Sequence, residues 1–126
     1  MPFDGKGMEI QLDTLDKIDR VIGLLDTPEK WCKGVLKSND GRRCILGAVL
    51  EVHADQVLKV PLLAAIEQVT GRSYPRIETF NDHRATTHAV VMQVLRQARR
   101  NILAGQHLAA VRPPTPGLWQ RLVALF

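Results

Sequence analysis

The stretch "EIQLDTLDKIDRVIGLL", residues 9–25, has the apolar spacing of an amphipathic helix. Its large aliphatic side chains recur at intervals of three and four residues, and acidic side chains lie between them. A helix with one apolar stripe needs other elements to cover that stripe, so the segment predicts a fold of packed helices. The stripe consists of Leu12, Leu15, Ile18, Ile22 and Leu25.

The chain downstream continues in a helical pattern. A second helix is predicted at 43–53, and a third from Pro61 to just before Gly71, because proline suits the start of a helix and glycine its end. Residues 72–82 read as a loop or a short extended piece, and 83–104 as the longest helix. We therefore predict an all-α fold, a compact bundle of about four helices with a docked C-terminal helical tail.

The end of the chain is set apart from this bundle. We expect a single helical domain at 1–111, a proline-rich linker at 112–117 and an amphipathic docking segment at 118–126. A tail this apolar is expected to dock on its own domain, on a second copy of the chain or on a protein partner. Truncation after residue 111 would test these options. The apolar face of the segment consists of Leu118, Trp119, Leu122, Val123 and Phe126.

Composition places the chain among ordinary globular proteins. Hydrophobic residues make up 45% of the 126 residues and charged residues 24%, and apolar runs are too short to span a membrane. The N-terminus lacks the basic-then-apolar pattern of a signal peptide, so the two cysteines are expected to be reduced thiols. These features predict a cytoplasmic protein without a membrane partner.

Charge is distributed unevenly along the chain. Acidic residues are abundant in the first 30 residues, and none follows Asp82, whereas six arginines do. Arg96, Arg99 and Arg100 fall at helical spacing, so Arg96 shares a face with both others. Such a face predicts at most weak, salt-sensitive binding to nucleic acid, and a solvated helix face balanced by the acidic N-terminal helix explains it equally well.

Cys44 is the one candidate nucleophile. In the first turn of a helix its thiolate would be favoured, and His83 with Asn81 or Asp82 would complete the set that cysteine catalysis requires. The competing interpretation is a small buried hydrophobe, because core-type residues follow it at 45–49. Cys32 lies twelve residues away and no short ligand pair exists, so neither a metal site nor a cofactor is predicted.

Three polar or aromatic residues have simpler structural interpretations. Asn81 or Asp82 is suited to cap the predicted helix at 83–104. Trp31 is most simply a core residue whose indole N–H needs one acceptor, which the "SNDG" turn at 38–41 is placed to supply.

The segments "WCKGVL", "DGRRCILGA" and "FND", followed by a threonine, resemble a family of small uncharacterised bacterial and phage domains. The resemblance covers roughly residues 9–104 and implies a helical domain in a phage or mobile-element setting, with no established activity. His83 and Arg84 depart from the family pattern, in which proline is common, and this weakens a Cys44–His83 pair. The resemblance selects Trp31, Gly34, Gly41, Cys44, Gly47, Ala48, Asn81, Asp82 and Thr87.

These residues suggest a polar clasp. Gly47 and Ala48 would let another backbone approach the second helix closely. Asn81 and Asp82 would then hydrogen-bond the turn at 38–41 or the start of that helix, around Cys44 and Trp31.

The favoured function is a non-enzymatic interaction protein, in concrete form a phage- or mobile-element-related modulator that binds another macromolecule. The alternatives are a cysteine-dependent hydrolase or transferase and a weak nucleic-acid binder. The residues selected for binding are Trp31, Cys44, Asn81, Asp82, Arg96, Arg99, Arg100, Trp119 and Phe126.

Overall fold

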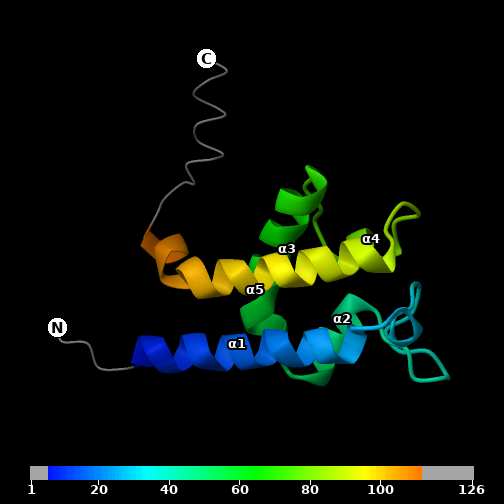
Figure 1. Cartoon of the computed structure of the whole chain (residues 1–126), viewed down its shortest axis with the longest axis horizontal. Helices are drawn as coiled ribbons and strands as arrows, with labels where there is room; N and C mark the ends of the chain where they lie inside the picture. Colours follow the sequence, from blue (N-terminus) through cyan, green and yellow to red (C-terminus); the bar gives the residue numbers. More distant parts are fainter. Residues whose placement is uncertain (1–5, 112–126) are drawn as a thin grey trace, which may run out of the picture.

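The structure, a computed structural model, describes the backbone of residues 6–111 and the side chains of residues 12–105. The described part of the chain is all-α. This confirms the predicted fold class. The predicted linker at 112–117 and docking segment at 118–126, with Trp119 and Phe126, lie outside the described residues. The helices are α1 (Lys6–Leu25), the short 3-10 helix η1 (Pro28–Lys30), α2 (Ile45–Glu51), α3 (Asp55–Thr70), α4 (Ile77–Asp82) and α5 (His88–Val111) (Figure 1).

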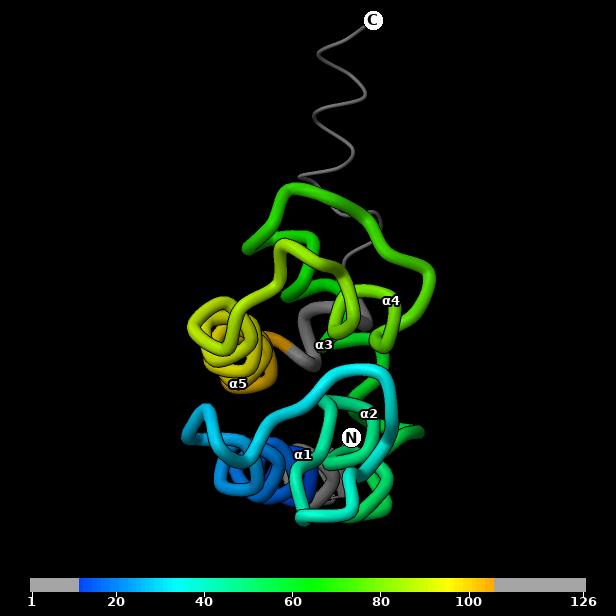
Figure 2. Tube along the Cα trace, turned by 90° about the vertical axis from the view of Figure 1, so that its right-hand side faces the viewer, coloured from blue at the N-terminus to red at the C-terminus, as the bar shows by residue number. Residues whose placement is uncertain are grey.

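The long helices α1 and α5 lie side by side in opposite directions, and α3 crosses them and packs on both (Figure 1). The view along α1 and α5 shows α2 and α4 stacked to one side of the pair (Figure 2). The loop between η1 and α2 and the loop between α4 and α5 meet at the same end of the bundle. We call this the loop end, defined by residues 31–44 and 81–87, which include the last two residues of α4.

The core is aliphatic and contains Phe80 as its one fully buried aromatic side chain among the described residues. The buried stripe of α1 runs through Thr14, Ile18, Val21 and Leu25, which is rotated from the predicted stripe. Leu12 is 59% exposed, so its inclusion in the core was wrong. The buried side chains of the other helices include Ile45, Val49, Leu58, Leu62, Ile66, Val91, Leu95 and Ile102.

Two helices differ from the sequence prediction at their starts. α3 begins at Asp55, and Pro61 lies inside it; the preceding turn stays helical because Leu58 is fully buried. The predicted end is confirmed, because Gly71 takes up the left-handed conformation with φ 77°. α5 begins at His88, where the Thr87 hydroxyl accepts a hydrogen bond from a first-turn N–H.

The segment predicted as a loop at 72–82 contains α4. Its helix places Ile77 and Phe80 three residues apart, and both are buried in the core. Asn81 and Asp82 are therefore the last two residues of α4. Their predicted role as caps of the long helix is wrong, because α5 starts six residues after Asp82.

Candidate functional site

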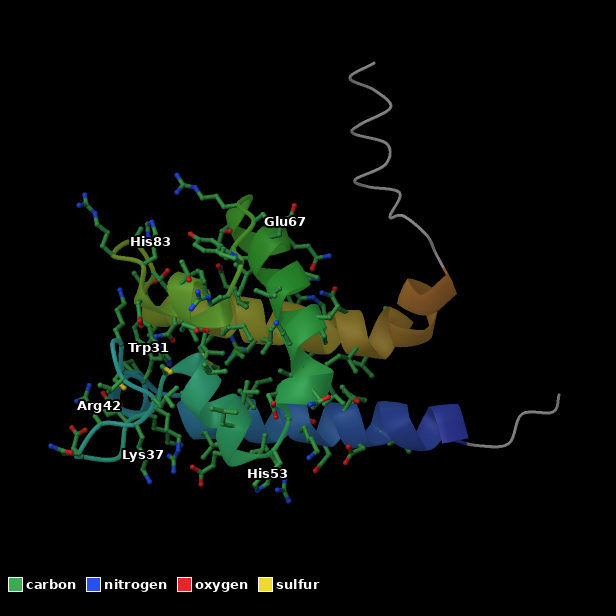
Figure 3. The ribbon with its side chains drawn as sticks, turned by 180° about the vertical axis from the view of Figure 1, so that it is seen from behind. Trp31, Lys37, Arg42, His53, Glu67 and His83 are labelled. Atoms are coloured by element: carbon green, nitrogen blue, oxygen red, sulfur yellow. The ribbon has the colours of Figure 1, made fainter. Side chains whose placement is uncertain are left out.

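The loop 31–44 is held in one shape by its own backbone. The N–H of Cys32 donates to the carbonyl of Arg43 at 3.1 Å, and the N–H of Arg43 donates to that of Lys30 at 2.8 Å. Farther out, the N–H of Ser38 donates to the carbonyl of Arg42 at 2.7 Å. These bonds tie the two arms of the loop together, so that residues 33–41 project from the bundle (Figure 3).

Asn81 anchors the base of this loop from α4. Its Oδ1 accepts from the indole N–H of Trp31 at 2.7 Å and from the backbone N–H of Ile45 at 3.0 Å. Its Nδ2 donates to the carbonyl of Cys32 at 3.1 Å and to a carboxylate oxygen of Asp82 at 2.9 Å. A side-chain amide has two acceptor and two donor positions, so Asn81, fully buried, is saturated.

Asp82 completes the clasp on its exposed side. One carboxylate oxygen accepts the Asn81 amide proton and also the backbone N–H of Gly34, the latter at 2.9 Å. Gly34 has φ 86°, a left-handed conformation that favours glycine. The predicted clasp is thus confirmed at the start of α2, while its second partner is the backbone at 32–34 and not the turn at 38–41.

Gly47 provides the close approach expected of it. A Cβ at this position would overlap the carbonyl oxygen of Leu36 and would lie 2.8 Å from its carbonyl carbon. The same carbonyl accepts the N–H of Cys44 at 3.2 Å. The absence of a side chain at Gly47 therefore lets the loop backbone lie directly on the first turn of α2.

Cys44 is the N-cap of α2 and not a first-turn residue. It is 3% exposed, which confirms the interpretation as a buried residue, and its Sγ accepts the N–H of Gly47 at 3.2 Å. Burial raises the pKa of the Cys44 thiol, and the hydrogen bonds from the N–H groups of Gly47 and Leu46 only partly oppose that effect. The thiol is thus disfavoured as a thiolate nucleophile.

His83 makes contacts outside a catalytic arrangement. Its Nδ1 accepts the backbone N–H of Ala85 at 3.0 Å, and its ring lies edge-on to Tyr74 at 6.2 Å between centroids. The two candidates for orienting the histidine, Asn81 and Asp82, both take part in the clasp. Both cysteines are free, and the described residues contain no group of three potential metal ligands.

Trp31 is half-buried between the loop and α5. Its indole N–H bonds to Asn81, so the predicted acceptor in the turn at 38–41 was wrong. The ammonium group of Lys33 lies 5.5 Å from the ring centroid and also donates to the carbonyl of His83 at 2.8 Å. His88, at the start of α5, lies 6.1 Å from the Trp31 ring, measured between centroids. The indole therefore has structural contacts on several sides.

The arginines of α5 do not act as one free basic face. Arg99 donates to Asp19 of α1 at 2.6 Å, and this hydrogen bond raises the pKa of the Arg99 guanidinium. Arg100 donates to the Gln97 side chain at 2.7 Å. Arg96 and Arg100 border an open surface depression. The face thus partly serves the α1–α5 contact, and nucleic-acid binding through it stays a prediction.

Sequence comparison places the chain in a family whose function is unknown. A family profile matches residues 10–101, most of the chain. The chain belongs to the family of unknown function DUF6197. The match spans α2, α3, α4 and both loops of the loop end, so the clasp lies within the DUF6197 region. No curated protein and no solved structure matches the chain.

None of the helices in the described part of this DUF6197 chain is long and apolar enough to cross a membrane.

The exposed residues of the loop were missed by the sequence reasoning. Val35 and Leu36 are 51% and 49% exposed, and Lys33, Lys37 and Arg42 lie near them in the sequence. The sequence does indicate a charged surface there, because residues 30–43 contain five bases and one acid.

Proposed function

We propose that this protein is a non-enzymatic binding protein, which acts by contacting another macromolecule. The observation that carries the proposal is that the candidate catalytic residues Cys44, Asn81 and Asp82 are engaged in contacts inside the protein. Asn81 uses all four of its hydrogen-bonding positions, and Cys44 is a buried helix cap. The part of the loop end that is exposed to solvent is a segment of chain with a fixed backbone conformation.

A segment of this kind suits recognition better than catalysis. Loops positioned by a rigid scaffold commonly carry binding residues. A loop already fixed in shape loses little conformational entropy when it binds. A cysteine enzyme would instead need an accessible thiol of lowered pKa with a histidine beside it, and Cys44 has a raised pKa. The proposal retains the phage or mobile-element setting, the cytoplasmic location and the tail at 118–126 as a second contact.

Affinity capture from the native host tests the proposal. The full-length chain, its Cys44→Ala variant and a chain of residues 1–111 are used as baits. We expect the full-length chain and Cys44→Ala to capture the same partner, because the thiol takes no part in binding. Loss of the partner from residues 1–111 would assign the contact to the tail.

The enzyme alternative makes the opposite prediction for the thiol. Rapid alkylation of Cys44 in the folded protein, with an apparent pKa well below that of an ordinary thiol, would contradict the proposal. Capture of no partner by any of the three baits would also count against it.

A further inference from the structure

One exposed stretch of the loop, residues 33–37, combines apolar and basic side chains. Val35 and Leu36 are neighbours in the chain and are both about half exposed, at 51% and 49%. Lys33 precedes them and Lys37 follows, and both are exposed. We call residues 33–37 the basic tip. Exposed aliphatic side chains surrounded by charge have the arrangement of a small interface centre with a polar rim.

The charge of this region is large for its length. Residues 30–43 contain five bases and one acid, a net charge of +4, which equals that of the whole chain. Three of these bases are paired with acids of the protein itself: Lys30 with Asp26, Arg42 with Asp40 and Arg43 with Glu51.

The two lysines of the basic tip differ from the paired bases. Neither Lys33 nor Lys37 forms an ion pair with any acid in the described part of the chain. The Lys33 ammonium group donates to the His83 carbonyl at 2.8 Å and lies 5.5 Å from the centroid of the Trp31 ring, and neither contact neutralises its charge. Both charges are therefore available to a group of negative charge outside the chain.

The tip is also presented in a fixed shape. The carbonyl of Leu36 lies against Gly47, and the N–H of Gly34 is held by Asp82. The carbonyl of Val35 faces the Cys32 thiol, which lies 3.8 Å from it. The backbone is thus held at each residue from 34 to 36, while the side chains of Val35 and Leu36 are about half exposed, which reduces the entropy lost on binding.

We propose that the basic tip docks into an apolar pocket rimmed by carboxylates on a partner protein. This rests on the proposed function and deepens it by naming the surface and the chemistry of the partner. Val35 and Leu36 fill the pocket, and Lys33 and Lys37 meet the acidic rim. A protein is favoured over nucleic acid because two aliphatic side chains form no hydrogen bonds to base edges and present no aromatic ring on which bases stack. Trp31, the nearby aromatic, is tied to Asn81 by its indole N–H.

Selection from a displayed random-peptide library, with the full-length chain as bait, tests the surface. The tip variant carries Val35→Ser with Lys37→Glu. The control variant carries Val60→Ser with Lys59→Glu, the same changes at exposed positions in the second turn of α3, where Val60 is 73% exposed. Selected peptides are synthesised, and their Kd values are measured by fluorescence anisotropy for all three proteins, whose melting temperatures are compared.

We expect the selected peptides to combine aspartate or glutamate with a large apolar residue. The tip variant should weaken their binding by about tenfold or more, since it removes an apolar contact and reverses a charge, whereas the control should change it by less than about twofold. Melting temperatures should stay equal within a few degrees for all three proteins.

Several outcomes would overturn the inference. These are a selection without enriched peptides, enriched peptides without acidic residues, or equal weakening by the tip and control variants. Binding of a short DNA or RNA oligonucleotide that is lost in the tip variant, with no peptide binding, would assign the surface to nucleic acid. If the tip variant still captures the native partner in the host, the binding-protein proposal stands and this surface is wrong.

Discussion

Replacing Asn81 by alanine should be among the most damaging single changes at the loop end. The change leaves three groups without their partner: the indole N–H of Trp31, the backbone N–H of Ile45 and the carbonyl of Cys32. An unsatisfied buried group costs about 1–3 kcal/mol. Ile45 is fully buried, whereas Trp31 and Cys32 are half-buried and regain water more easily. The expected loss is therefore about 2–4 kcal/mol in the free energy of unfolding.

Urea unfolding followed by far-ultraviolet circular dichroism measures this loss, and a thermal melt should show Tm lowered by roughly 6–16 °C. The matched control is Asn101→Ala on α5, where the amide contacts the side chains of Gln97 and Gln68 near the surface. This control should lose less than about 1 kcal/mol. A loss below about 0.5 kcal/mol for Asn81→Ala, or equal losses for the two variants, would refute the assignment of Asn81 as the anchor of the loop.

Four further predictions concern neighbouring contacts. Gly47→Ala should lower stability by about 2 kcal/mol or more, because its Cβ would overlap the loop backbone. Gly23→Ala, with open space around it, should raise stability by up to about 1 kcal/mol. Thermal melts compare the two variants, and equal effects would contradict the packing argument. Iodoacetamide should modify Cys32 before Cys44, and the rate of alkylation of each thiol should still increase above pH 9.0, because burial raises the pKa of both thiols. Peptide mass spectrometry over time measures these rates. Fast labelling of Cys44 at neutral pH would disprove the prediction. Because the pKa of the Cys44 thiol is raised in the folded protein, its contribution to stability is fully present below the pKa that the thiol has in the unfolded chain. That contribution is lost as the pH rises through the pKa of the thiol in the folded protein. Cys44→Ala should therefore make Tm fall less steeply with pH in the alkaline range. Lys17→Met should lower the free energy of unfolding in urea by about 1 kcal/mol, because the ammonium group of Lys17 donates to the carbonyls of Val52 and His53 at the end of α2. An unchanged free energy would show that water replaces the ammonium group as the donor.

The helical class could be predicted from the sequence because it depends on local periodicity. α1 shows this, since Ile18 and Leu25 are buried as predicted. The exact register was wrong because Leu12 is as apolar as Ile18 and Leu25. Only the position of α5 and α2 decides that Thr14 and Val21 face inward.

Short elements could not be predicted in the same way. α4 has six residues, too few for a helical period to stand out, and Pro75 just before it indicates a loop. Its helix is stabilised by burying Ile77 and Phe80 against the rest of the protein. That energy comes from tertiary packing and leaves no local signal.

The candidate site was predictable in outline and not in detail. The resemblance selected Asn81, Trp31 and Gly47, and the structure brings the first two into direct contact and places Gly47 beneath the loop. The partners of Asn81 could not be deduced, because an asparagine near a helix start is usually a cap. Its real contacts depend on how α4 docks against a loop 50 residues earlier in the chain.

The bond between Asn81 and the N–H of Ile45 makes the movement of the loop measurable by amide hydrogen exchange. This N–H, at the first residue of α2, has a side chain from another helix as its acceptor. The Gly34 N–H is likewise held by Asp82. These two amides should therefore exchange together whenever the clasp opens, while the amides in the middle of α1 and α5 stay protected. Their shared exchange rate would report the free energy of releasing the loop from an otherwise folded bundle.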